Sequence, residues 1–116
     1  MAVVTGTPVK GELNKITEFA FEAATTASDG VKYVLPKVTE EYVKVLVTNT
    51  DTTTAYDITL KKPTKGSYAA ASADEVHELA AGEFAFINIE SARFANTDGT
   101  ILLVPENAKV KVAVIY

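Results

Sequence analysis

Few residues of this chain belong to the types that perform enzyme chemistry. The sequence contains no cysteine and a single histidine, His77, which lies beside Glu75 and Glu78. A catalytic histidine acts on a nucleophile or binds a metal with other ligands, and neither a nucleophile-elbow motif nor a second partner accompanies this one. We therefore interpret His77 as a solvated or locally hydrogen-bonded side chain. The sequence predicts a protein that is not an enzyme and that holds no metal or cofactor.

Three groups of carboxylates have spacings that could supply an acid and a base. They are Glu40-Glu41, Asp74-Glu75-Glu78 and Glu18-Glu22. Alternating strand positions and turns account for all three groups, so we do not assign them to a glycosidase-like site. Two further segments, residues 49–51 and 96–99, carry the oxygen ligands that calcium prefers. Neither has the full spacing of a calcium-binding loop, and we interpret both as turns.

Arg93 is the charged residue with the most distinctive candidate role, because it is the single arginine of the chain. It precedes Phe94 and lies close in sequence to Asp98-Gly99. A guanidinium group offers a rigid fork for bidentate hydrogen bonds that a lysine cannot imitate. We expect Phe94 to close one end of the fold and Arg93 to tie the Asp98-Gly99 turn to it. The alternative is an intermolecular contact through Arg93.

The elements that must position these residues follow a period of two, which is typical of half-buried β-strands. We expect strands at residues 18–23, 31–35, 42–47, 56–60, 84–89, 101–104 and 109–116. The run 84–89 is apolar on both sides, which predicts a central strand. A loop or an arch between sheets should join 42–47 to 56–60. Residues 96–99 carry the strongest tight-turn signal.

Residues 72–82 allow two interpretations. The segment Ser72-Ala73-Asp74-Glu75 has the spacing of a capping box, and Gly82 suits a C-terminal cap, so a helix of two turns fits. Against a helix, only Val76 and Leu79 are apolar in a useful phase. We favour a strand here.

Roughly seven to nine short strands without a convincing amphipathic helix predict an all-β fold, namely an antiparallel β-sandwich. It would be Ig-like, with a jelly roll as the nearest alternative. With 116 residues the chain is long enough for one domain with a real core. We expect the sandwich over residues 17–116 and an irregular N-terminal arm over residues 1–16.

The expected arm mixes β-branched residues with two glycines and a proline, so it cannot easily continue a ladder. It is either a frayed terminus or a segment that adds to the sheet edge of a neighbour. Its candidate contact residues are Val3, Val4, Pro8 and Val9.

Charge and hydropathy exclude several partners. The net charge of −4 repels a phosphate backbone, and the lysines form no cluster, so we expect no nucleic-acid binding. No apolar run approaches the roughly 20 residues of a membrane span, and the N-terminus lacks the pattern of a signal peptide. We therefore expect no membrane association. We expect the protein to be made in a bacterial cytoplasm, and the lack of cysteine agrees with this.

The order of motifs in the second half resembles a family of small β-sandwich structural proteins of tailed bacteriophages. The residues that carry the resemblance are Val76 to Gly82, Phe84 to Ile89, Arg93-Phe94, Asp98-Gly99 and Val110 to Tyr116. The resemblance places an edge strand near residues 76–79 and implies a structural protein encoded near the capsid genes.

From this resemblance, the small size and the acidity, we expect a decoration or cement protein on the capsid surface of a virion. Its partner would be the major capsid protein, and it would self-associate into a homo-oligomer, with a trimer as one option. A head-completion or tail-associated protein is the alternative of the same class. An Ig-like adhesion module that binds a glycan or a cell surface is the alternative of another class. A glycan site needs a stacked aromatic, for which the candidates are Tyr33, Tyr42, Tyr56 and Tyr68.

Overall fold

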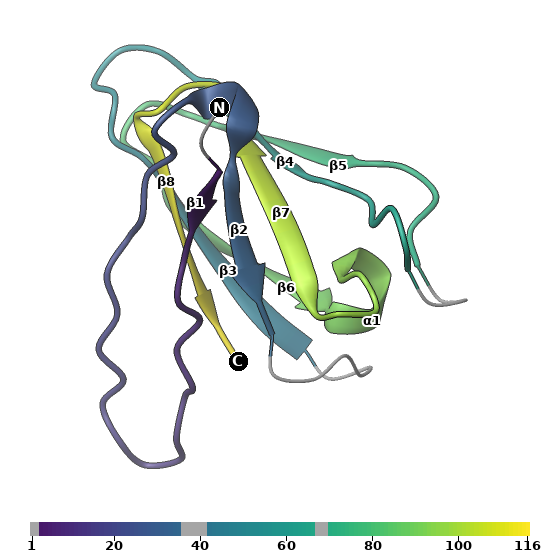
Figure 1. Ribbon diagram of the computed structural model, residues 1–116. Helices are drawn as coiled ribbons and strands as arrows, with labels where there is room; N and C mark the ends of the chain where they lie inside the picture. The colour runs from purple at the N-terminus through teal and green to yellow at the C-terminus, as the bar shows by residue number, and fades with distance from the viewer. Residues whose placement is uncertain (1–2, 36–41, 67–69) are drawn as a thin grey trace.

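The computed structural model describes residues 3–35, 42–66 and 70–116, which fold into two β-sheets packed face to face (Figure 1). The first sheet has the strand order β1-β2-β7-β4-β5, with β1 at Val4–Thr5, β2 at Val31–Val34, β7 at Thr100–Pro105, β4 at Tyr56–Leu60 and β5 at Glu75–Leu79. The second sheet has the order β6-β3-β8, with β6 at Phe84–Glu90, β3 at Tyr42–Asn49 and β8 at Val110–Ile115. The prediction of an all-β sandwich is confirmed.

The core lies between the two sheets and consists of the inward residues of alternating strand positions. It includes Val31 and Tyr33 of β2, Val43, Val45 and Val47 of β3, Ile58 and Leu60 of β4, Ile101 and Leu103 of β7, and Val110, Val112 and Val114 of β8. Each such side chain contributes about 1.5–3 kcal/mol on burial. The alternation seen in the sequence therefore corresponds to the two faces of each strand.

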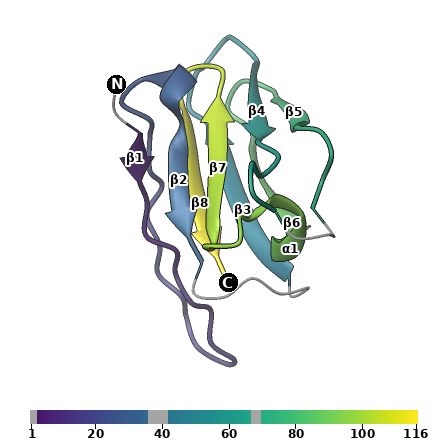
Figure 2. The same cartoon turned by 45° about the vertical axis from the view of Figure 1, so that its right-hand side comes forward.

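The chain crosses repeatedly between the sheets, and Figure 2 shows the layers. The connection from β3 to β4 passes from the second sheet to the first, as expected for residues 42–47 and 56–60. The segment with two interpretations is a strand, β5, and it lies at the edge of the first sheet. The turn at residues 96–99 is also present, because the Gly99 amide donates to the carbonyl of Asn96 over 2.8 Å and Gly99 has a φ of 89°.

Two strand predictions are wrong. Residues 18–23 form no strand, and Glu22 alone makes an isolated bridge, to Val112 of β8. The reason is that β8 shares its outer edge between Glu22 and Val9, which leaves no free edge for a longer ladder. Residues 84–89 do form a strand, but β6 is an edge strand and β3 is the central one. Its second apolar face lies outside the core, where Phe84 and Phe86 are exposed.

The N-terminal segment is docked on the sandwich. Strand β1 pairs in parallel with β2, and Val9 makes a parallel bridge to Ile115 of β8. The segment therefore passes from the edge of one sheet to the edge of the other, and the edges with which it pairs belong to its own chain rather than to a neighbour. Residues 12–20 then leave the body of the molecule as a long loop, seen in purple and blue in Figure 1.

Two short helices were not expected. The 3-10 helix η1 covers Ala27–Asp29, and α1 covers Ser91–Phe94 between β6 and β7. The predictions that involve Glu40-Glu41 and Tyr68 concern residues outside the described part of the chain.

Candidate binding face

The outer face of the second sheet carries an unusual concentration of aromatic side chains. Cross-strand partners point to the same face of a sheet, so the pairs Thr48↔Phe84 and Leu46↔Phe86 place both phenylalanines on the face opposite the core. Phe84 is 59% and Phe86 56% exposed, and Tyr42 on the same face of β3 is 71% exposed. Large aromatics at this exposure remain hydrated at a cost that a partner would remove.

The N-terminal loop extends this aromatic face. The ring of Phe21 lies 5.3 Å from that of Phe84, and Phe19 lies 5.4 Å from Phe21, both edge to face. Leu46 and Ala113 point to the same side of the sheet and are buried, yet they lie outside the core cluster. We define the aromatic face as Phe19, Phe21, Tyr42, Phe84 and Phe86. It contains four of the five phenylalanines of the chain.

One lysine adds a positive charge to the aromatic face. Lys44 Nζ lies 5.7 Å from the centroid of the Phe86 ring, within the range of a cation–π contact, and it donates to Asn88 Oδ1 over 3.4 Å. These contacts hold the ammonium group beside the rings and leave it open to solvent, because Lys44 is exposed.

The tip of the loop carries two further apolar side chains, Leu13 and Ile16, with 91% and 94% of their surface exposed. Asn14 between them has a φ of 59°, a left-handed conformation that asparagine tolerates better than most residues. An ion pair of 3.1 Å between Glu12 and Lys15 closes the turn. The turn thus holds both apolar side chains in solvent.

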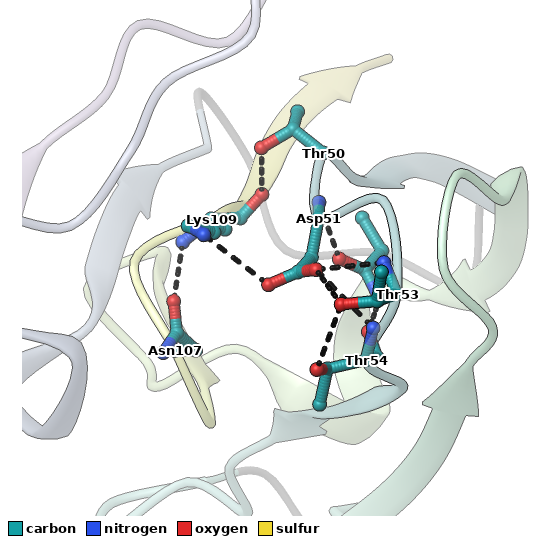
Figure 3. A network of polar contacts seen from close by, with 7 residues as sticks. Thr50, Asp51, Thr53, Thr54, Asn107 and Lys109 are labelled. Carbon is teal, nitrogen blue, oxygen red and sulfur yellow. Dashed lines mark hydrogen bonds and ion pairs between the residues drawn. The ribbon is translucent and has the colours of Figure 1, made fainter.

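The strongest polar network lies at the arch between β3 and β4 (Figure 3). Asp51 Oδ1 accepts hydrogen bonds from the amides of Thr53 and Thr54, over 2.9 and 3.2 Å. Lys109 Nζ lies 3.3 Å from Asp51 Oδ2. The backbone hydrogen bond from Thr53 comes first among the causes that lower the pKa of Asp51 to about 2, although burial opposes it.

Asn49 supports the same arch from within the protein. Its side-chain amide donates to the carbonyls of Thr54 and Leu79 over 2.9 and 3.1 Å, and its Oδ1 accepts from the Asp51 amide over 3.0 Å. With donors on both Asp51 oxygens, this stretch is built as an Asx turn, as the sequence interpretation of residues 49–51 proposed. In the described part of the chain, no group of three or more histidine, aspartate or glutamate side chains could hold a metal ion.

A second network fastens the N-terminal segment to the core. The hydroxyl of the buried Tyr33 donates to Glu22 Oε1 over 3.1 Å, and Glu22 Oε1 also accepts from the Thr7 amide over 3.2 Å. Burial, followed by the negative charge of Glu22 and this hydrogen bond, raises the pKa of Tyr33 far above its ordinary value. Gly6 passes over the Tyr33 ring so closely that a side chain there would overlap it.

The anchor that the sequence predicts around Arg93 is present only in part. Phe94 is buried in the core cluster, as expected for a residue that closes the fold. Arg93 is exposed, and among the described residues its guanidinium makes no hydrogen bond or ion pair with the turn at Asp98-Gly99. Asp98 instead accepts from the Thr100 amide over 3.0 Å, which is the main cause of its lowered pKa. The arginine lies on α1, whose last turn points it to solvent.

The other candidates are spread over the molecule. Val4 and Val9 are half-buried in contacts with β2 and β8, and Val3 is exposed. Asp74 forms a 2.9 Å ion pair with Lys61, outside any cluster with a second acid. Of the tyrosines considered for a glycan site, Tyr33 is fully buried and Tyr42 is the most exposed described one.

The aromatic face was not predicted from the sequence. The available signal was the pair of phenylalanines in residues 84–89, which were interpreted as the second buried side of a central strand. In this two-layer sandwich the outer face of the second sheet is largely open to solvent, on the central strand β3 at Tyr42 as well as on the edge strand β6, so the two phenylalanines on that side are exposed.

Fold and surface together define an all-β sandwich with an exposed aromatic face. Comparison of the chain with protein-family models, with curated proteins and with solved structures finds no match. The resemblance to phage structural proteins therefore depends on the motifs alone and stays a prediction. Among the described residues, no helix has the length and apolar character needed to cross a membrane.

Proposed function

We propose that this protein is a non-enzymatic structural protein that binds a larger protein assembly through its aromatic face. The observation that carries the proposal is the placement of four of five phenylalanines outside the core. Interfaces concentrate aromatic residues at their centres, and a monomer that kept these rings in water would gain nothing from them.

The resemblance in the second half of the chain favours the head of a tailed phage as the assembly. In this role the protein is a decoration protein on the capsid surface, its partner is the major capsid protein, and several copies associate, for example as a trimer. A head-completion or tail-associated position is the variant of the same proposal. Many copies on a repeating shell give avidity even when a single contact is weak.

The test is binding of the purified chain to expanded heads from the phage that encodes it, measured by co-sedimentation. The double variant F84S/F86S should bind at least about 30-fold more weakly, because truncation of a single central aromatic in an interface already costs about 2 kcal/mol. The matched control is V76S, since Val76 is similarly exposed on the other sheet. Equal binding of both variants contradicts a role for the aromatic face, and failure of the unaltered chain to bind heads contradicts the capsid assignment.

A second candidate function is glycan binding by an adhesion module. Tyr42 favours it, because this ring is exposed next to Lys44 on a flat sheet surface, and sugars stack on such rings. A glycan array separates the two: Y42A should abolish any glycan signal while F84S/F86S abolishes shell binding. A silent array rejects the adhesion role.

A further inference from the structure

A groove opens between the edge strands of the two sheets, β5 and β6, on the side of the sandwich seen at the right of Figure 2. Its volume is about 450 Å³, within the usual range of ligand-binding pockets. Its apolar lining consists of Val47, Leu79, Ala85, Phe86 and Ile87. The groove therefore offers both an apolar floor and two strand edges.

Alternate peptide groups of β6 point away from β3, toward the groove, and pair with no other described strand. The Asn49 amide donates to the Glu83 carbonyl over 2.9 Å, which identifies 49 and 83 as a hydrogen-bonded pair. Such pairs alternate along an antiparallel ladder, so Ala85 and Ile87 bond to β3. The peptide groups of Phe84, Phe86 and Asn88 point the other way, toward an edge where no described strand pairs.

The rim of the groove is acidic. Glu78 and Glu83 line it, while no lysine or arginine does among the described residues. His77 Nε2 is buried at the same place without a hydrogen-bond partner in the described part, and Glu75 Oε1 lies 3.4 Å from it. A ligand that pairs with the carboxylates of Glu78 and Glu83 brings positive charge to the rim.

The opposite side of the sandwich shows how such edges are covered. There the chain's own N-terminal segment pairs with β2 and then with β8, so both sheet edges gain an extended neighbour. On the side of β5 and β6 no described segment does the same.

We propose that this groove binds an extended basic segment of a partner protein, which adds a strand to β6. The segment pairs with the peptide groups of Phe84, Phe86 and Asn88, places small apolar side chains on Leu79 and Ile87, and sets lysine or arginine side chains against the acidic rim. The site shares Phe86 with the aromatic face but uses the backbone edge of β6 rather than the exposed rings, and the inference goes beyond the proposed function without depending on a capsid partner.

The experiment uses the isotope-labelled full chain and a capped heptapeptide in which valine and threonine alternate between two terminal lysines. Amide NMR signals of Phe84, Phe86 and Asn88 should shift and exchange more slowly with solvent, while those of β8 stay unchanged. Binding should weaken with salt. The peptide with glutamates in place of both lysines should bind at least about threefold more weakly, as expected for partly exposed charge pairs.

Three changes, two in the protein and one in the peptide, test charge and backbone pairing separately. E78Q should weaken binding by about threefold, with E12Q on the distant loop as matched control. A peptide N-methylated at its central valine loses a backbone donor and should not bind, and it leaves the protein unaltered, so misfolding cannot explain the loss. N88P should act in the same way, because an outward amide on an edge strand can be replaced by proline without loss of the ladder.

Any of these results overturns the inference: equal binding of the lysine and glutamate peptides, shifts confined to Phe19, Phe21 and Tyr42, or no binding at millimolar peptide. Protection of the same amides that grows with protein concentration in the absence of peptide would identify a second copy as the occupant and also overturn it. Loss of head binding by F84S/F86S tests the proposed function separately, since it uses no peptide.

Discussion

Replacement of Asn49 by alanine should destabilise the protein by about 3 kcal/mol. Asn49 is fully buried and makes three hydrogen bonds through its side chain, to the carbonyls of Thr54 and Leu79 and from the amide of Asp51. A hydrogen bond contributes about 1 kcal/mol net, and a buried group left without a partner costs about 1–3 kcal/mol. The Leu79 carbonyl bond is buried, so water cannot readily replace the lost amide.

Urea unfolding followed by circular dichroism measures this effect. With a slope of about 1.5–2 kcal/mol per M, a loss of about 3 kcal/mol lowers the midpoint by roughly 1.5–2 M at unchanged slope. The matched control is N88A, because Asn88 is exposed on β6. Its free energy of unfolding should change by less than about 0.5 kcal/mol. A loss below about 1 kcal/mol for N49A refutes the assignment of Asn49 as the support of the arch.

Three more outcomes follow from the polar networks and the close contacts. Asp51 has a pKa of about 2 against an ordinary 3.8, so its contribution to stability is complete above pH 3.8 and is lost as the pH falls toward 2. Urea midpoints measured over this pH range should fall for the unaltered chain and change less for D51N. Because the pKa of Tyr33 is raised, stability should fall as pH rises above about 10, and Y33F should remove most of this decline in alkaline melts. G6A should lower stability by about 1–3 kcal/mol, because the new methyl group would overlap the Tyr33 ring. G82A, at a positive φ but in open space, should cost about 1 kcal/mol. Equal melting temperatures for G6A and the unaltered chain would contradict the contact between Gly6 and Tyr33.

The sequence predicted the strands because a period of two reports which residues face the core. Residues 31–34, 42–49, 56–60 and 110–115 show this pattern, and the structure places their alternate positions inside. The ambiguous segment at residues 75–79 was also predicted as a strand, since only Val76 and Leu79 are apolar in a helical phase and the resemblance places an edge strand there.

What the sequence could not predict is the order of strands in each sheet. Phe84 and Phe86 have the pattern of a buried strand, yet β6 forms at an edge because β3 takes the central place between β6 and β8. Residues 18–23 alternate equally well but find no free edge. Both outcomes depend on contacts between residues far apart in the chain, which local periodicity does not contain.

The candidate site shows the same limit. A turn at residues 49–51 was predicted, and the structure shows that its side-chain oxygens accept hydrogen bonds from nearby amides. The role of Arg93 was not, because a short helix turns its side chain to solvent, and the resemblance gave no helix there. The groove needs β5 and β6 side by side, which only the folded chain provides.

The parallel contact between the N-terminal segment and β8 has a mechanical consequence. Val9 and Gly11 donate to the carbonyls of Val114 and Tyr116 over 2.9 and 2.8 Å, and the Tyr116 amide returns a bond of 2.9 Å to Val9. Tension that draws the segment before Val9 one way and the segment after Ile115 the other way runs along these two neighbouring segments. The three hydrogen bonds are then loaded together in shear and must yield almost at once, whereas antiparallel strands pulled from one end open bond by bond. A sandwich closed in this way resists stretching along its strands more than its modest size would imply.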